Sequence, residues 1–459
     1  MIKRSLSHIR KMLNASIDEN FKDVDINGIS IDSRTIDKDN LYIPIVGEKF
    51  DGRIFIKECE EKGASAFIID KSYSIPSNIK IPYVIVEDTK KALQLLAKEY
   101  IKEVNPKTIA ITGSNGKTTT KDLMYSVIKK KYKVKKTMGN LNNEIGLPKT
   151  ILTLDDDDEV AILEMGTEDF GEISLLTDIA KPDIAIITNI GDSHLLKLKT
   201  REGIAKAKLE IIEGLKKDGI FLYNGDDETL KKQVPLKHIS HKVITFGQDS
   251  TNDIQIKEIE TSITGNRFSI GIDSFKVPLL GNHQLYNGAV AVIVARLLDI
   301  DDDIIKEGLT DVKVTGNRNE LVECVGFDIL NDAYKSNPQS LEQAIKTLEL
   351  FQGYKRKIAV LGDMLDLGNN EKELHYRIGQ KLNPSKIDYV VLIGELSKEI
   401  YKGAIEKFPK SRIYHFKNKD DLIDAIKYII TKSTLVLVKG SRAMHMEEII
   451  EGIKDLKVI

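Results

Sequence analysis

Short apolar runs rich in β-branched residues alternate along this chain with longer stretches whose apolar residues recur at helical spacing. In the middle of the chain the runs are residues 108–111, 161–163, 184–187, 220–223 and 243–246, and in the last third they are residues 358–361, 390–393 and 435–438. Strands alternating with helices predict parallel sheets with helices on both faces. The chain is therefore predicted to be an α/β protein.

The same pattern divides the chain into three predicted domains. A small α/β domain is expected at residues 1–104, with strands at 29–31, 41–45, 66–69 and 83–86, a helix at 54–62, and a second helix capped by Asp88. A central α/β domain is expected at residues 105–314, including a β segment at 254–259 and 268–272 and a helix at 285–298. A doubly wound α/β domain is expected at residues 315–459. A chain of 459 residues exceeds the size of a single core.

Residues 112–120, TGSNGKTTT, stand between a predicted strand and a predicted helix over residues 122–130. Gly113 and Gly116 allow a tight turn whose N–H groups approach an anion. Lys117 adds a positive charge, and Thr118 adds a hydroxyl that can reach a phosphate-bound Mg²⁺. The first glycine stands two residues later than in the standard phosphate loop, but the strand and helix flank it as that mechanism requires. We therefore predict a mononucleotide-binding loop, favoured over an ordinary turn with a surface lysine.

Other polar residues follow the central strands, where ligands bind in open parallel sheets. Glu164 and His194 come after successive strands, and an oxygen ligand with a neutral imidazole favours a Mg²⁺ site beside the loop. Asn140, Asn142 and Asn143 suit either a substrate site or an Asn-rich turn, and the residues alone do not decide between them. Because lysines are mostly exposed in folded proteins, the helical stretch with Lys206 and Lys208 is interpreted as a solvated lysine face.

Composition and charge limit the classes of protein to which the chain can belong. The net charge of −2 gives no reason to expect nucleic acid as a partner, and no apolar run reaches membrane-spanning length. The two cysteines, Cys59 and Cys324, lie far apart and suggest neither a disulfide framework nor a metal site. With no evident signal peptide, we expect a cytoplasmic protein, and a monomer.

Several longer motifs occur in a fixed order: TGSNGKTTTK, GNLNNEIGLP, LEMG, NIGDSHL and AKAKLE, followed by NDAYKSNPQSL, LGDMLDLG and VLVKGSRAMHMEEI. Together they resemble the ATP-dependent Mur ligases, which build the stem peptide of peptidoglycan for the cell wall. The later motifs are similar to those of the type that adds D-Ala-D-Ala. The resemblance runs from about residue 29 to the C-terminus.

The resemblance implies a UDP-substrate-binding domain, an ATP-binding domain and a Rossmann-like third domain. It implies that ATP and Mg²⁺ are used to join UDP-MurNAc-tripeptide to D-Ala-D-Ala. The implied nucleotide and catalytic residues are Gly113, Ser114, Asn115, Gly116, Lys117, Thr118, Thr119, His194, Lys208, Asn282, His283, Asn287, Arg318 and Asp332. The resemblance implies that Mg²⁺ would be held by Thr118, Glu164, His194 and a carbamylated Lys208. This role for Lys208 is the opposite of the solvated lysine inferred above. Substrate contacts would come from Ser33, Arg34, Phe50, Asp51, Gly52, Asn140, Asn142 and Asn143.

Two departures from the family pattern stand in the third domain. Where the family commonly reads DSYNANP, Lys335 replaces the first Asn, and Asn317 separates Gly316 from Arg318. Three rival functions remain: another ligase of this superfamily, such as an amino-acid-adding Mur ligase or a folylpolyglutamate synthase; a nucleotide-binding regulatory protein without catalysis; and a motor or transport ATPase. The sequence does not indicate whether the third residue of the acceptor peptide is diaminopimelate or lysine, or whether a depsipeptide can replace D-Ala-D-Ala.

Overall fold

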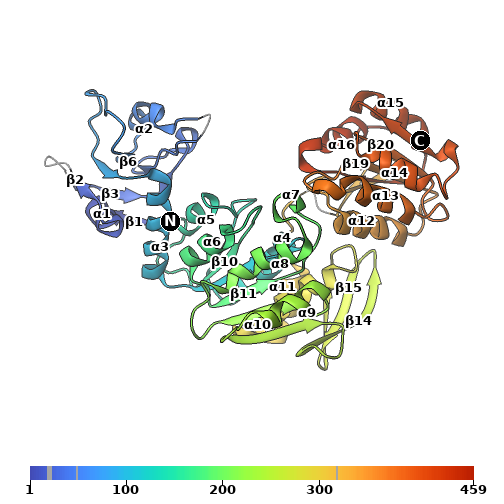
Figure 1. The fold of residues 1–459 in the computed structure, drawn as a ribbon, viewed down its shortest axis with the longest axis horizontal. Helices are drawn as coiled ribbons and strands as arrows, with labels where there is room; N and C mark the ends of the chain where they lie inside the picture. Colours follow the sequence, from blue (N-terminus) through green and yellow to red (C-terminus); the bar gives the residue numbers. More distant parts are fainter. Residues whose placement is uncertain (18–22, 48–49, 317–318, 459) are drawn as a thin grey trace.

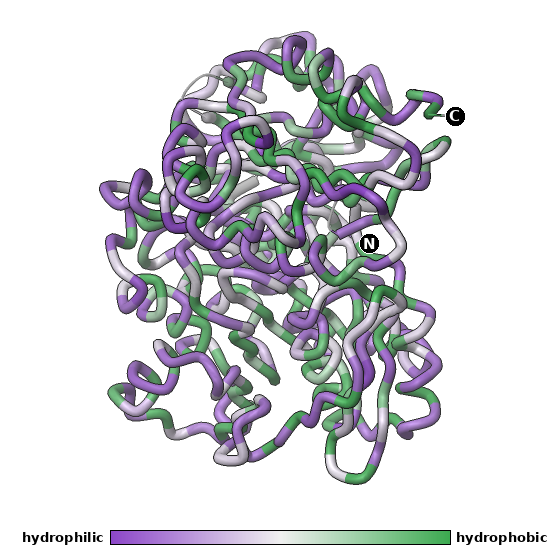
Figure 2. Tube along the Cα trace, turned by 90° about the vertical axis from the view of Figure 1, so that its right-hand side faces the viewer, coloured by the Kyte–Doolittle hydropathy of each residue, from purple (hydrophilic) through white to green (hydrophobic). Residues whose placement is uncertain are grey.

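The computed structural model describes residues 1–17, 23–47, 50–316 and 319–458. Its main β-structure is built from sheets of five, nine and six strands that follow one another along the chain. Figure 1 shows the first part (blue) and the last part (red) on opposite sides of the central part (green and yellow). The α/β prediction is confirmed. Figure 2 shows hydrophobic and hydrophilic stretches alternating along the trace in every part, as buried strands and amphipathic helices require.

The first part joins a small sheet, parallel except for its β2–β7 pair, to a short antiparallel pair. The sheet has the order β2-β7-β6-β5-β4, and β1 pairs with β3. The strands are β1 (Lys3–Ser5), β2 (Ser16–Ile17), β3 (Asp25–Asn27), β4 (Ile29–Ser30), β5 (Leu41–Tyr42), β6 (Ala66–Asp70) and β7 (Tyr83–Val86). The helices are α1 (Leu6–Leu13), α2 (Ile56–Glu61) and α3 (Thr89–Val104), with 3₁₀ turns η1 (Ser33–Thr35) and η2 (Gly52–Phe55). The helix predicted over residues 54–62 is therefore a 3₁₀ turn followed by a shorter α-helix.

The central sheet has the order β16-β15-β14-β13-β12-β11-β8-β10-β9, parallel from β9 to β14 and antiparallel beyond. Its strands are β8 (Lys107–Thr112), β9 (Val134–Lys136), β10 (Val160–Glu164), β11 (Ile184–Ile187), β12 (Ile220–Asn224), β13 (Lys242–Gly247), β14 (Ile254–Ser262), β15 (Gly265–Ile270) and β16 (Asp273–Val277). The helices are α4 (Lys117–Ile128), α5 (Gly146–Ile151), α6 (Glu172–Ala180), α7 (Leu195–Leu198), α8 (Arg201–Leu209), α9 (Glu228–Gln233), α10 (Gln284–Leu297) and α11 (Asp302–Thr310). Strand β8 thus lies between β10 and β11, and the carboxyl ends of the three strands lie side by side.

The last part is a second doubly wound unit. Its sheet has the order β17-β18-β22-β19-β20-β21, with only the β17–β18 pair antiparallel. The strands are β17 (Glu320–Glu323), β18 (Phe327–Asn331), β19 (Arg356–Gly362), β20 (Tyr389–Ile393), β21 (Ile413–Phe416) and β22 (Thr434–Lys439). The helices are α12 (Pro338–Leu350), α13 (Glu371–Lys381), α14 (Ser397–Ala404), α15 (Lys419–Ile429) and α16 (Glu447–Ile453). Among the described residues, no helix combines the length and apolar character needed to cross a membrane.

Candidate active site

The loop between β8 and α4 has the geometry predicted for a phosphate cradle. Gly113 has φ +152° and Gly116 has φ +83°, and a Cβ on Gly113 would lie 1.9 Å from Thr188 Oγ1. The loop is fixed from β11, because Thr188 Oγ1 donates to the carbonyl of Asn115 at 2.6 Å and the Asn115 N–H donates to Asn189 Oδ1 at 3.0 Å. The two glycines are therefore required for the backbone to pass this close to its neighbours.

Lys117 is the first residue of α4, and its side chain folds back over the loop. Its ammonium donates to the Gly113 carbonyl at 2.5 Å and to the Ser114 carbonyl at 3.4 Å. The N-terminus of α4 has no side-chain cap, so its first N–H groups face the loop. A positive charge, the N-terminal N–H groups of the helix and the helix dipole then converge where a phosphate would bind.

Glu164, the last residue of β10, is buried beside this loop. Its Oε2 accepts hydrogen bonds from the Thr118 hydroxyl at 2.9 Å and the Lys121 ammonium at 3.2 Å, and its Oε1 accepts from Asn142 at 2.9 Å. Burial alone would raise the pKa of Glu164, but the ammonium groups of Lys121 and Lys117 outweigh it and hold that pKa below its ordinary value. The site therefore contains a carboxylate that is ionised at neutral pH.

His194 and Lys208 are two basic residues near Lys117 and Lys335. Burial lowers the pKa of His194 to about 3, assisted by the charges of Lys208, Lys117 and Lys335. Lys208 is 2% exposed, and burial followed by the charges of Lys117 and Lys335 lowers its pKa well below the ordinary value. Among the described residues its ammonium has no hydrogen-bond or ion-pair partner. The solvated-face interpretation is therefore wrong for Lys208, whereas Lys206 is exposed as that interpretation requires.

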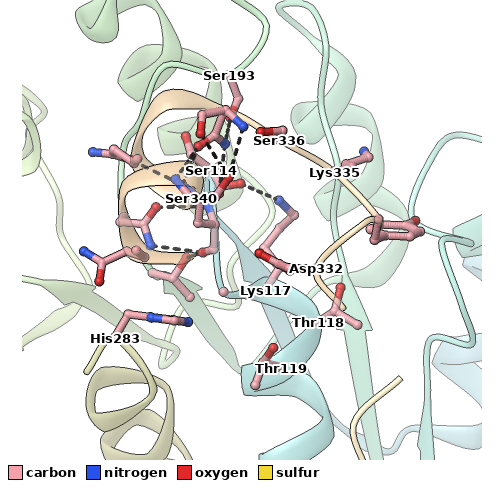
Figure 3. Close-up of a pocket in the computed structure, with 18 of the residues that line it drawn as sticks. Ser114, Lys117, Thr118, Thr119, Ser193, His283, Asp332, Lys335, Ser336 and Ser340 are labelled. Atoms are coloured by element: carbon pink, nitrogen blue, oxygen red, sulfur yellow. Dashed lines mark hydrogen bonds between the residues drawn. The ribbon is translucent and has the colours of Figure 1, made fainter. Parts of the chain in front are cut away.

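The third domain contributes the opposite wall. The amides of Asn337 and Asn115 pair, with Asn337 Nδ2 donating to Asn115 Oδ1 at 2.9 Å, and Asn337 Nδ2 also donates to Ser193 Oγ at 2.9 Å. Gln339 Nε2 donates to the carbonyl of Ile190 at 3.3 Å. Because Asn337 caps α12, the N-terminal end of that helix lies against the phosphate loop (Figure 3).

A buried ion pair fixes the strand ends of this wall. Lys439 Nζ lies 2.6 Å from Asp332 Oδ2 and also donates to the carbonyl of Lys335 at 2.8 Å. Lys439 ends β22 and Asp332 directly follows β18, so the pair joins two adjacent strands at their carboxyl ends. Losing either partner would leave a buried charge uncompensated, which typically costs about 3–5 kcal/mol.

Together these walls enclose a cavity of about 970 Å³. From the sequence-predicted site residues it brings together Ser114, Asn115, Gly116, Lys117, Thr118, Thr119, Asn140, Asn142, Glu164, His194, Asn282, His283, Asn287 and Asp332. Asn143 does not line it, because its side chain instead accepts from the Gly146 N–H at 2.8 Å and holds the turn before α5. Arg318 and Asn317 lie outside the described residues.

Asn287 supports the loop as well as lining the cavity. Its Oδ1 accepts from the Thr120 hydroxyl at 3.1 Å, and a Cβ on Gly116 would approach that oxygen to 2.6 Å. Burial and the charge of Lys439 lower the pKa of His283 to about 4, so this ring is neutral. Phe246, Gln248 and Tyr286 line the same region. Sequence reasoning missed them, although Phe246 ends the predicted strand at 243–246 and Tyr286 lies in the predicted helix at 285–298.

The predicted substrate residues of the first domain do not line this cavity. Arg34 is exposed and pairs with Asp32 at 2.7 Å, and Phe50 is also exposed and stacks on Phe55. Asp51 accepts from the Arg53 N–H at 3.0 Å, and the Gly52 carbonyl accepts from Tyr42. Ser33 is buried in η1. These residues form turns away from the cavity, and residues 48–49, which precede Phe50, lie outside the described residues.

The loop that follows β19 is held in place by a buried histidine. His375 is fully buried, its Nδ1 faces the Glu371 carbonyl at 2.6 Å, and its Nε2 accepts from the Met364 N–H at 2.9 Å. Burial lowers the pKa of His375, against the raising effect of the Glu371 carbonyl. Leu365 and Asp366, which follow Met364, line the cavity. The neutral ring is therefore part of the native loop structure.

This arrangement predicts a pH effect on stability. The folded-state pKa of His375 lies below its pKa in the unfolded chain. The contribution of the neutral ring to the free energy of unfolding is therefore complete above about pH 6.5. It is lost as pH falls, by at most ~1.4 kcal/mol per pH unit. Urea denaturation followed by circular dichroism between pH 5 and 8 measures this slope. His375→Gln should flatten it below pH 6.5, and an unchanged slope would show that the ring does not titrate with unfolding.

Comparison with known proteins agrees with this architecture. Three family descriptions match in sequence order: "Mur ligase family, catalytic domain" at residues 25–101, "Mur ligase middle domain" at 111–295, and "Mur ligase, glutamate ligase domain" at 317–442. The chain is 42% identical to the UDP-N-acetylmuramoyl-tripeptide–D-alanyl-D-alanine ligase of Bacillus subtilis, over 99% of both chains.

Solved structures give the same result. A crystal structure of MurF from Acinetobacter baumannii matches with a TM-score of 0.88 at 26% identity, over 99% of both chains. MurF ligase from Thermotoga maritima, solved in complex with ADP, matches with a TM-score of 0.81 at 30% identity, over 93% of this chain and 97% of that one. These matches confirm the three-domain architecture expected from the sequence motifs. The chain therefore belongs to the Mur ligase family.

Proposed function

We propose that this protein uses ATP to join D-Ala-D-Ala to UDP-MurNAc-tripeptide, forming UDP-MurNAc-pentapeptide, ADP and phosphate in peptidoglycan synthesis. The observation that carries the proposal is the cavity in which the phosphate loop of the central domain faces the strand ends of the third domain. The full-length similarity to a curated ligase of this specificity supports the choice of substrates.

The chemistry follows from the leaving group. A carboxylate does not accept an amine, because its charge repels the nucleophile and oxide is a very poor leaving group. Transfer of the γ-phosphoryl group of ATP to the acceptor carboxylate gives an acyl phosphate, from which phosphate can leave. The amine of D-Ala-D-Ala then attacks the carbonyl carbon, the C–O bond breaks, and an amide forms. Phosphoryl transfer needs mainly positioning and charge neutralisation, which Lys117 and the α4 N-terminus supply.

The donor set near the loop fits Mg²⁺. Thr118 supplies a hydroxyl and Glu164 an ionised carboxylate, both hard oxygen ligands, and their oxygens lie 2.9 Å apart. Mg²⁺ commonly binds through one or two carboxylates together with substrate phosphates, so a cluster of acidic residues is not required. We assign these residues and His194 to metal binding, where the ion would neutralise phosphate charge.

Lys208 is proposed to carry a carbamate. A buried amine with a strongly lowered pKa is neutral and nucleophilic, and it can add CO₂ to give N–CO₂⁻ with release of a proton. The product is an anion placed among Lys117, Lys335 and the proposed metal site, where a second cation is least favourable. The modification thus converts an uncompensated base into an oxygen ligand.

The remaining binding sites are assigned domain by domain. We assign the ATP site to residues 105–314, and amine-substrate contacts together with closure over ATP to residues 315–459. Ser33, Arg34, Phe50, Asp51 and Gly52 are assigned to the uridine nucleotide in residues 1–104, away from the cavity. Asn140 and Asn142 are assigned to the acceptor, since both line the cavity. Because acyl phosphates react with water, the domains are expected to close before chemistry.

Replacing Glu164 by glutamine tests the metal assignment. The shape is kept but the charge is lost, so the Mg²⁺ concentration for half-maximal turnover should rise at least about tenfold. Lys121 would lose its buried counter-charge, and stability should fall by about 3–5 kcal/mol. Magnesium titrations below the melting temperature measure the first effect, with the exposed Glu228→Gln on α9 as control. An unchanged magnesium requirement would remove Glu164 from the site.

The function itself is tested by substrate dependence. ADP release should require both UDP-MurNAc-tripeptide and D-Ala-D-Ala, and mass spectrometry should show the pentapeptide product. Single amino acids offered with the corresponding shorter UDP-peptides test an amino-acid-adding ligase, and glutamate with a folate tests a folylpolyglutamate synthase. ATP turnover independent of an acceptor would instead favour a motor or regulatory ATPase and would overturn the proposal.

A further inference from the structure

Lysine side chains from the central and third domains line the same cavity. Lys117 comes from the start of α4, at the phosphate loop, and Lys335 comes from the segment that follows β18; both line the cavity. Like charges facing one another across a partly buried space are unfavourable unless an anion lies between them. An anion bound between Lys117 and Lys335 would therefore be stabilised by both side chains.

Lys335 is the member of this group that the reaction described above does not use. Its backbone is held firmly, because its carbonyl accepts from Lys439 and Lys439 pairs with Asp332. Its side chain is exposed to the cavity and has no hydrogen-bond or ion-pair partner in the part of the chain that the structure describes. Figure 3 shows Lys335 in the same pocket as Lys117 and Thr118, although it comes from the other domain. A fixed backbone thus presents an unsatisfied cation to the space beside the loop.

We propose that Lys335 contacts the terminal phosphoryl group of the bound nucleotide from the third-domain side and neutralises its charge during transfer. The inference rests on the function proposed above and adds a catalytic residue to it. The ammonium acts as a point charge across the cavity from Lys117, so the phosphoryl group would lie between two cations from different domains.

The test compares nucleotides that differ in one phosphoryl group. Lys335→Asn removes the charge, and Lys335→Arg keeps it. With Mg²⁺ present, Lys335→Asn should bind a non-hydrolysable ATP analogue roughly tenfold more weakly, while ADP affinity changes less than about twofold. Lys335→Arg should stay within about threefold of the parent for both ligands. Lys346→Asn, an equal charge change on the exposed face of α12, controls for net charge.

The outcomes separate this inference from the proposed function. Equal losses of ADP and analogue affinity, or no loss of either, would overturn the role of Lys335. Neither result would contradict the proposed ligase function. A raised bicarbonate requirement with unchanged analogue affinity would show that Lys335 serves a carbamate on Lys208 and would also overturn it. If the parent protein forms no pentapeptide, the proposed function fails, whereas the binding comparison still decides whether Lys335 contacts the terminal phosphoryl group.

Discussion

Replacing Lys117 by alanine is expected to lower turnover by at least about 10³-fold, the largest effect of any single change considered. Lys117 supplies the positive charge at the loop, and its ammonium already lies on the loop carbonyls that surround the phosphate position. ATP affinity should fall as well, because the charge acts on the nucleotide before transfer as well as during it. Steady-state ADP release and equilibrium binding of an ATP analogue measure the two effects.

Lys129→Ala is the matched control, since Lys129 is the exposed residue at the other end of the same helix. It should leave both quantities unchanged within about twofold, as surface substitutions generally do. Unaltered ATP affinity and turnover in the Lys117 variant would mean that the loop is an ordinary turn and that the nucleotide binds elsewhere.

Replacing Lys208 by methionine should abolish most turnover without weakening the fold. A carbamate ligand would be lost, and we expect a decrease of at least about 100-fold. Methionine fills the same buried space without an amine, so the free energy of unfolding should stay the same or rise by ~1 kcal/mol or more. A variant that is at least as stable as the parent but inactive cannot be explained by misfolding.

The modification itself is measured separately. With ¹³C-bicarbonate the parent protein should show a carbamate carbonyl resonance that is missing from the methionine variant, and turnover should fall in CO₂-free buffer. Lys206→Met, on the exposed face of the same helix, should retain both the resonance and the activity. Full parent activity without CO₂, and without any carbamate signal, would contradict the assignment.

The strands that carry the site were predictable because they are buried and β-branched. Predicted runs at residues 108–111, 161–163 and 184–187 correspond to β8, β10 and β11, whose ends hold the loop, Glu164 and Thr188. Less regular elements were missed: β16 reads DSFKV, and the run predicted to end at residue 272 stops at Ile270, before a turn at Gly271 with φ +66°. Helix α4 begins at Lys117 rather than residue 122, because its start depends on the left-handed Gly116 rather than on a side-chain cap.

The local parts of the site followed from sequence, and the long-range parts did not. Glycine and lysine spacing identified the phosphate loop, because that chemistry lies within a few residues. The amide pair of Asn115 and Asn337 joins residues 222 apart, and only the docking of α12 brings them together. Lys121 carries a weak signal, one helical turn after Lys117, but its burial against Glu164 depends on how α4 packs on the sheet.

Lys208 shows why residue type alone misleads at a functional site. A lysine in a helix is usually solvated, and its neighbour Lys206 is. Helical geometry places the two about 200° apart around α8, so one faces solvent and the other the interior. Under the proposed carbamylation, the buried amine becomes an oxygen ligand, a role that only the motif resemblance indicated.

The central claim is that the γ-phosphoryl group passes from ATP to the acceptor carboxylate. UDP-MurNAc-tripeptide labelled with ¹⁸O in the carboxylate that accepts the amine tests it directly. Since the C–O bond of the acyl phosphate breaks when the amine attacks, the released phosphate should carry one ¹⁸O atom for each pentapeptide formed. Phosphate without ¹⁸O, alongside normal pentapeptide formation, would show that the carboxylate is never phosphorylated and would contradict the account.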